Sequence, residues 1–214
     1  MNALTTHRLT DRPLIGPDSA GIAMTPEEYD ALPPDEWERG FRYELIHGVL
    51  VVSPVPAESQ QSPNDYLGHL LRVYQEGHPN GNSLDRTTFE RRVKTTAGYR
   101  VCDRALWIGF GRAIKIHKDV PTIVVEFVSA GKRAFLRDYE EKRDEYLAAG
   151  VKEYWVIDWI QSQMTAYFSP PASADHRVIA RTERIYTTPL LPGFELPLDK
   201  LLALAEEGNV AEEE

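Results

Sequence analysis

Cysteine is almost absent from this chain, since Cys102 is the single one among 214 residues. One thiol cannot form an internal disulfide framework or a multi-cysteine zinc site, so the composition indicates a reducing compartment. The six histidines show no paired ligand spacing, and we expect no zinc site built on them.

Long hydrophobic runs are also missing. Residues 1–21 lack the continuous apolar core of a signal peptide, and no run approaches the roughly 20 apolar residues that span a bilayer. We therefore expect a cytoplasmic protein with no membrane partner. With 42% hydrophobic residues, the chain favours one domain, at 24–205. A flexible extension is expected at 1–23 and an acidic, disordered tail at 206–214.

The sequence has no overall excess of positive charge, because its formal net charge is −9. The segment 86–118 is the exception, with nine Arg and Lys residues against Glu90 and Asp103. Such a segment can hold a phosphate backbone although the whole chain is acidic. The alternative is that these side chains occupy the solvent-exposed faces of antiparallel strands. The sequence leaves both interpretations open.

Hydrophobic periodicity predicts a mixed α/β fold with an N-terminal β-hairpin around His47 and Gly48. Strands are expected at 41–46, 49–54, 87–95, 100–108, 120–128, 153–158 and 164–168, with an edge strand at 177–187. Helices are expected at 25–32, 64–75 and 132–149 and after a turn at 190–197. Apolar residues on both faces of 120–128 indicate a central strand.

Two acids lie inside these apolar strands, Asp103 in YRVCDRALWIG and Glu126 in PTIVVEFVS. An ionised carboxylate in a dry interior loses several kcal/mol of solvation unless it is paired or bound to a metal. Lys142 follows on a predicted helix, where its spacing from Tyr139 and Tyr146 places it on the sheet-facing side. If strand register brings the acids to one face, they predict a site for a divalent metal and an activated water.

Each of these residues also has a purely structural interpretation. Asp103 can form a surface ion pair with Arg104, and Glu126 can form a structural pair with Lys142. Lys142 can instead be a solvated helix residue, and Glu44 a strand-edge acid. The sequence alone does not choose between these interpretations and the metal site.

A longer resemblance rests on VPTIVVEFVSAGKRAFLRDYEEKRDEYLAAGVKEYWVIDW, together with MTPEEYDALP, RYELIHGVLVVSPVPAES, RVCDRALW and LLPGFELPL. In this order, over residues 24–202, they resemble the bacterial family of putative restriction endonucleases in the PD-(D/E)XK nuclease superfamily. The resemblance implies a restriction-endonuclease-like core, with a central mixed β-sheet flanked by helices. It also implies a Mg²⁺-dependent endonuclease that hydrolyses DNA, with Mn²⁺ as a substitute ion, RNA as an alternative substrate and a homodimer as an expected assembly.

The resemblance assigns roles to individual positions. Asp103 and Glu126 match the metal-binding acids, and Glu44 matches an acidic position that often assists the metal. Val128 stands where the superfamily usually has its catalytic lysine. Lys142 matches the basic or polar group that this family supplies from the following helix instead. Gln61 is a weaker candidate for a site residue, because relatives often have a histidine near this position.

One departure from the family pattern opens an alternative function. Thr122 stands where relatives usually have an aspartate in the strand that leads to Glu126. If that aspartate belongs to the metal shell, this chain is a catalytically degenerate protein that binds nucleic acid or a protein partner without cleavage. If it only caps the strand, activity is unaffected.

Overall fold

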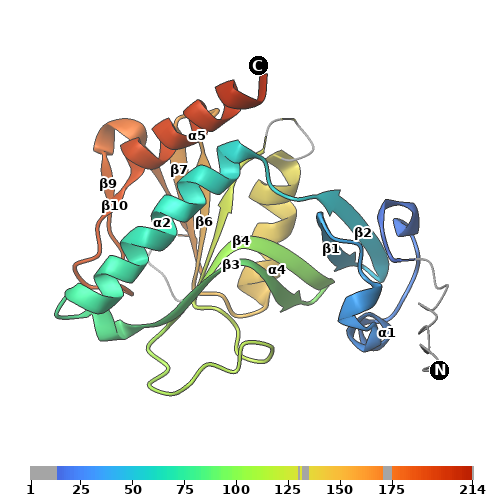
Figure 1. Ribbon diagram of the computed structural model, residues 1–214. Coiled ribbons are helices and arrows are strands. Elements are labelled where there is room, and N and C mark those ends of the chain that lie inside the picture. The colour runs from blue at the N-terminus through green and yellow to red at the C-terminus, as the bar shows by residue number, and fades with distance from the viewer. Residues whose placement is uncertain (1–13, 130, 132–134, 171–174, 214) are drawn as a thin grey trace, which may run out of the picture.

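The computed structural model describes residues 14–129, 131, 135–170 and 175–213. Its centre is an eight-stranded mixed sheet in the order β2-β1-β4-β5-β6-β7-β8, with β3 paired to β4 outside this path. Helices α2 and α5 cover one face and α4 covers the other (Figure 1). The mixed α/β architecture predicted from the sequence is confirmed.

The predicted N-terminal hairpin is present as β1 (Phe41–Ile46) and β2 (Val49–Pro54). His47 and Gly48 connect them with φ values of 50° and 78°, the pair of positive angles that a tight two-residue hairpin turn needs. Helix α1 (Pro26–Ala31) precedes the hairpin and begins with a capping box between Thr25 and Glu28.

Residues 14–23, the described part of the predicted flexible extension, contact the N-terminal region of the fold. Ile15 forms a β-bridge with Trp37, and Ala23 forms one with Val49 of β2. Apolar residues of this segment can therefore pack on the hairpin instead of remaining in solvent. Residues 1–13, which carry the rest of that expectation, lie outside the described part of the chain.

The remaining strands of the main sheet agree closely with the predicted ones, except for the last, β8. They are β3 (Leu84–Thr95), β4 (Gly98–Ile108), β5 (Ile123–Phe127), β6 (Glu153–Asp158), β7 (Gln163–Phe168) and β8 (His176–Ala180). Strand β5 runs antiparallel to β4 and parallel to β6. Every residue of β5 and β6 is buried, which is the mark of central strands covered on both faces.

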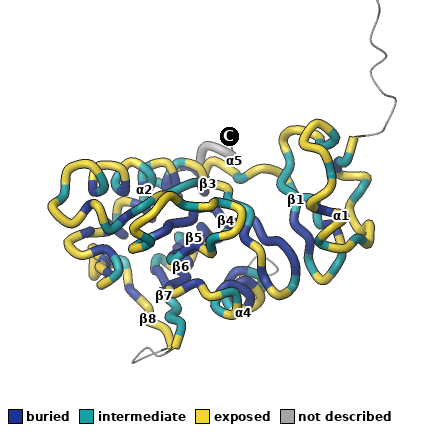
Figure 2. The backbone as a smooth tube through the Cα atoms, turned by 90° about the horizontal axis from the view of Figure 1, so that it is seen from below, coloured by how far each residue is buried: buried dark blue, intermediate teal, exposed yellow. Residues whose placement is uncertain are grey.

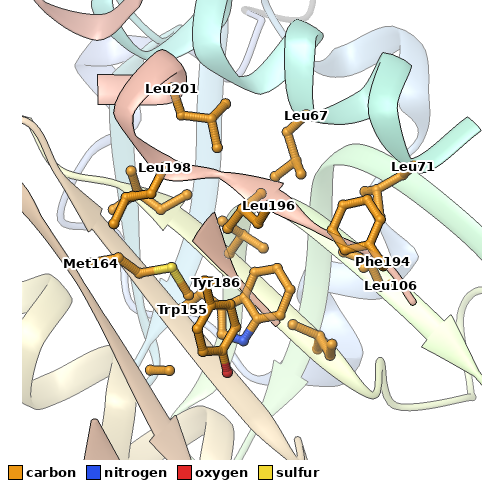
Figure 3. Close-up of a cluster of buried hydrophobic side chains, with 14 of the residues drawn as sticks. Leu67, Leu71, Leu106, Trp155, Met164, Tyr186, Phe194, Leu196, Leu198 and Leu201 are labelled. Carbon is orange, nitrogen blue, oxygen red and sulfur yellow. The ribbon is translucent and has the colours of Figure 1, made fainter. Parts of the chain in front are cut away.

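Two hydrophobic clusters fill the spaces between sheet and helices. The first joins α2 (Glu58–Gly77) and α5 (Leu198–Glu213) to the sheet through residues such as Leu67, Leu201 and Trp155 (Figure 3). The second lies beneath α4 and includes Tyr146 and Trp107. Figure 2 shows the buried residues concentrated in the sheet and on the inner sides of the helices. None of the helices in the described residues has the length and hydrophobicity to cross a membrane.

The helix predicted at 132–149 contains an irregular turn. A π-helical segment, Arg137–Glu141, leads into α4 (Lys142–Ala148), and Gly150 follows with φ 103°. Residues 132–134 of the predicted helix lie outside the described part of the chain. Such wide turns occur frequently at functional sites, and Lys142 directly follows this one.

The C-terminal part differs from the sequence prediction in two places. The edge strand expected at 177–187 is divided into β8, a 3-10 turn (Arg181–Glu183) and β9 (Ile185–Tyr186), and β9 pairs with β10 (Leu196–Pro197) in a separate two-stranded sheet. The segment expected as a disordered tail continues α5 as far as Glu213. Gly208 lets α5 approach α2, because a Cβ there would lie 2.7 Å from the Ser59 nitrogen. Further 3-10 turns lie at Pro17–Ser19, Pro34–Glu36 and Gly81–Ser83.

Candidate functional site

Strand register brings Asp103 and Glu126 to the same region of the sheet. Arg104 of β4 lies opposite Val125 of β5, so the next position along the antiparallel pair sets Asp103 against Glu126. The backbone N–H of Phe127 donates to Asp103 Oδ2 at 2.7 Å, so the Asp103 side chain reaches β5. Both acids are buried, with 1% and 2% of their surfaces exposed. The condition on register that the sequence left open is therefore met.

Glu126 is held by two groups from the helix on that face. Lys142 Nζ lies 2.9 Å from Glu126 Oε2, and the Tyr146 hydroxyl donates to Glu126 Oε1 at 3.1 Å. Burial raises the pKa of Glu126 above its usual range, and Lys142 offsets only part of that effect. Burial lowers the pKa of Lys142, but the attraction of Glu126 and Asp138 outweighs it and raises this pKa. Lys142 is therefore a buried ammonium within the site, and the interpretation of a solvated helix residue is wrong.

Asp103 is paired with a cation that the sequence reading missed. Arg42 of β1 places Nη2 at 2.7 Å from Asp103 Oδ1 and at 3.2 Å from Glu90 Oε1. Burial lowers the pKa of Arg42, but its pairing with Asp103 outweighs burial and raises the pKa. The Arg104 pairing considered from the sequence does not occur, because Arg104 donates from Nε to Asn64 Oδ1 of α2 at 2.7 Å.

Glu44 lies near these acids but has a different partner. Its Oε1 accepts a hydrogen bond from the Val101 backbone N–H at 2.8 Å. Within the described ranges, no group of three or more His, Cys, Asp and Glu residues is arranged to hold a metal ion. The geometry thus gives no support to Glu44 as a third ligand beside Asp103 and Glu126, and the ligand set stays a prediction.

The two remaining acids suit a hard divalent cation. Mg²⁺ in proteins is usually held by one or two carboxylates and keeps several of its waters. Asp103 and Glu126 provide two such groups, and each already attracts a cationic side chain, Arg42 or Lys142. An ion bound here would compete with Arg42 for Asp103 Oδ1. The chemistry of the donor set therefore fits a two-carboxylate magnesium site.

Each of the two acids lines a pocket that is open to solvent. A cavity of about 260 Å³ is lined by Glu126 and Lys142 together with Arg42, Glu44, Gln60, Val101, Ser129, Arg137 and residues 53–57. A groove of about 450 Å³ shares Val55, Pro56 and Gln60 with this cavity and reaches Asp103. A substrate can therefore approach both acids from solvent.

Two further side chains in or beside the cavity, Asp138 and Gln60, were not predicted. Asp138 is buried, lies 3.5 Å from Lys142 Nζ and pairs with Arg137 at 2.9 Å. Its position four residues before Lys142 on a predicted helix was the signal that could have identified it. Gln60, and not its neighbour Gln61, contacts the end of β5, since Gln60 Nε2 donates to the Phe127 carbonyl at 2.7 Å. Gln61 is exposed and donates to the Pro56 carbonyl.

Thr122 lies away from the acid pair. Its Oγ1 accepts from the Ile108 backbone N–H at 3.0 Å, at the start of β5. Glu126 is four residues further along this extended segment, roughly 13 Å away at about 3.3 Å per residue. The side chain at position 122 thus joins β4 to the residues before β5, which is a structural role.

The arginines of the basic segment 86–118 are largely engaged within the protein. Arg100 is buried and donates to Glu145 of α4, and Arg104 is buried against α2. Arg91 donates to the Ile116 carbonyl, and Arg92 pairs with Asp30. These arginines therefore form neither a free phosphate-binding surface nor a solvent-exposed strand face. They connect strands and helices within the protein.

Comparison with known proteins gives a consistent result. A family model described as "Putative restriction endonuclease" matches residues 26–199, which is well over half of the chain. A solved structure titled as a putative nuclease belonging to DUF820 from Anabaena variabilis ATCC 29413 superposes with a TM-score of 0.64 at 16% identity, over 85% of this chain and 99% of that one. At this identity the likeness shows the fold alone. The curated proteins gave no match. The chain belongs to the family that its matching model describes as "Putative restriction endonuclease".

Proposed function

We propose that this protein is a metal-dependent endonuclease that hydrolyses phosphodiester bonds in DNA. The observation that carries the proposal is the meeting of two buried strand acids, Asp103 and Glu126, with the buried ammonium of Lys142 beside an open cavity. Burying unlike charges in this way seldom stabilises a fold more than apolar packing does. A site that is also open to solvent supports a chemical role for these groups.

Each residue has a role in the proposed reaction. Asp103 and Glu126 would hold Mg²⁺, with Mn²⁺ as its substitute, and the bound ion would supply an acidified water and neutralise charge on the phosphate. Lys142 would hold the attacking water beside Glu126 or offset the charge that develops on the phosphate oxygens. In the hydrolysis, the water oxygen bonds to phosphorus while one bridging oxygen leaves and takes a proton.

The cavity is suited to a phosphate group. Arg42 and Arg137 line it together with Lys142, so three cationic side chains border the space next to Glu126. Charge-assisted hydrogen bonds from guanidinium groups to phosphate are short and directional, and they position the group for attack. We therefore assign the scissile phosphate to this cavity.

A second candidate function is binding of nucleic acid or of a protein partner without cleavage. One observation favours it: each acid is already paired with a cationic side chain, Asp103 with Arg42 and Glu126 with Lys142. Against it, Thr122 caps the far end of β5, so the residue change that suggested a degenerate site does not alter the acid pair. Retention of both acids and of Lys142 supports the catalyst.

The test is a cleavage assay with matched variants. Supercoiled plasmid, linear DNA and RNA are incubated with the protein in Mg²⁺, in Mn²⁺ and in EDTA. Asp103→Asn, Glu126→Gln and Lys142→Met should each lower the cleavage rate by about 10²-fold or more, as loss of such groups typically does. Asp144→Asn removes an exposed acid that pairs with its neighbour Arg143, and it should leave cleavage unchanged.

The outcomes separate the candidates. Metal-dependent cleavage of DNA that disappears in the three site variants supports the endonuclease. Binding of DNA in EDTA with no cleavage in either metal would instead support a protein that binds nucleic acid without cutting it. Cleavage of RNA alone would change the proposed substrate from DNA to RNA. The expected homodimer, a two-fold assembly suited to cutting both strands, is tested by light scattering on the same preparation.

A further inference from the structure

Phe89 of β3 is an exposed aromatic side chain beside the candidate site. It has 67% of its surface exposed, more than any other large hydrophobic side chain in the described residues. It lines the groove of about 450 Å³ that also contains Asp103. An isolated exposed apolar residue needs no explanation, but a large aromatic ring at the edge of a site that binds nucleic acid has an obvious ligand in the π-face of a base.

The backbone holds Phe89 firmly in this position. Phe89 pairs across the sheet with Arg104, and Arg91 pairs with Cys102, so the register of β3 against β4 is kept on both sides of Glu90. Glu90 itself has φ 44°, which is rare for a residue other than glycine and costs free energy. The Glu90 carboxylate also accepts a hydrogen bond from Arg42, the partner of Asp103. The strained position thus connects Phe89 to the acid site.

Charge divides the open space into two unlike parts. Among the described residues, the groove is lined by Asp65, Glu90 and Asp103 and by no Lys or Arg. The adjoining cavity has a small excess of positive charge, since Arg42, Arg137 and Lys142 line it together with Glu44 and Glu126. A phosphate is attracted to the cavity and repelled from the groove. An uncharged base suits the groove, which also presents the amide groups of Gln60, Gln61 and Asn64 for hydrogen bonds to base edges.

We propose that Phe89 is a stacking platform for the nucleobase next to the scissile phosphate. The inference rests on the proposed function and specifies its substrate class. A base can stack on Phe89 only when one of its faces is free, so the preferred substrate is single-stranded or locally unpaired nucleic acid, and regular duplex is bound less well. The phosphate occupies the cation-lined cavity while its base enters the acidic groove.

The experiment measures binding without cleavage. A fluorescein-labelled single strand and the duplex of the same sequence are titrated in EDTA with the full chain and its variants, by fluorescence anisotropy. Stacking of a base on an aromatic side chain is worth about 1–3 kcal/mol, so Phe89→Ala should weaken single-strand binding by about 5- to 150-fold. Phe89→Trp should keep wild-type affinity, Phe89→Leu should resemble Phe89→Ala, and duplex binding should change little in all three.

A matched control comes from another surface. Val73 of α2 is 55% exposed and lines a different, apolar pocket, so Val73→Ala should bind like the wild type. Equal single-strand affinity of Phe89→Ala and wild type would overturn the stacking role and leave the nuclease proposal intact if the protein still cleaves. If the wild type binds no nucleic acid and cleaves none, the proposed function fails and this inference fails with it.

Discussion

The pair formed by Arg42 and Asp103 provides a direct test of metal binding that does not depend on catalysis. Arg42 Nη2 lies 2.7 Å from Asp103 Oδ1, and the two side chains are 13% and 2% exposed. Removing one partner of a buried ion pair typically costs about 3–5 kcal/mol, because the other charge remains buried without compensation. In EDTA, Arg42→Met should therefore lower the free energy of unfolding by about that amount.

A divalent ion should reverse much of this loss. In the wild type an ion must compete with Arg42 for Asp103 Oδ1, whereas in Arg42→Met it meets an uncompensated carboxylate. A ligand that binds only the folded state stabilises it by about 2.7 kcal/mol at 100 times its Kd. A tenfold tighter Kd in the variant would narrow its stability gap to the wild type by about 1.4 kcal/mol at saturating ion.

The assay is urea unfolding followed by tryptophan fluorescence, in EDTA and in millimolar Mg²⁺ or Mn²⁺. Arg177→Met is the control, because Arg177 pairs with Glu183 at 2.7 Å on an exposed strand. Such surface pairs contribute about 0–1 kcal/mol, and the control should show no response to the ion beyond that of the wild type. If the ion stabilises Arg42→Met no more than the wild type, Asp103 is not a ligand that Arg42 screens, and the two-carboxylate site is refuted.

Two further changes test the packing around the site. Lys142→Met and Glu126→Gln should each lower the free energy of unfolding measured in urea. The double variant should lose less stability than the sum of the two single losses, because it leaves neither charge unpaired. Additive losses would contradict the pairing of these side chains at 2.9 Å. Gly98→Ala should lower the thermal midpoint, because Gly98 has φ 134° and a Cβ there would overlap the Leu45 carbonyl oxygen where β1 meets β4; an unchanged midpoint would contradict that close approach.

Local signals in the sequence were sufficient for most of the fold. His47 and Gly48 fixed the β1–β2 turn, because few other pairs of residues accept two positive φ angles. The run EYWVID gave β6 with its observed limits, since it is an uninterrupted apolar segment with polar residues at both ends. Helix α2 was predicted too short at its start, because its apolar periodicity begins only at Leu67, whereas the helix begins at Glu58 and includes Pro63.

Long-range pairing was the part that local signals could not give. Arg42 and Asp103 are 61 positions apart and meet only because β1 and β4 are neighbours in the sheet. The division of the expected strand 177–187 has the same origin, since β9 leaves the main sheet to pair with β10 after Arg184 takes a φ of 65°. Residue patterns report which face of a strand is buried, but they do not report which strand lies beside it.

Two buried ion pairs on α4 show why Glu126 differs from an ordinary structural acid. Burial raises the pKa of Glu145, but hydrogen bonds from Arg100 and Thr95 outweigh burial and lower it. For Glu126 burial prevails over Lys142, in part because Asp103 and Asp138 add negative charge, and the pKa is raised. Glu145 is compensated by its neighbours, whereas the pKa of Glu126 stays raised although Lys142 lies beside it. A divalent cation bound beside Glu126 would offset the repulsion between these acids, which supports the proposed metal site.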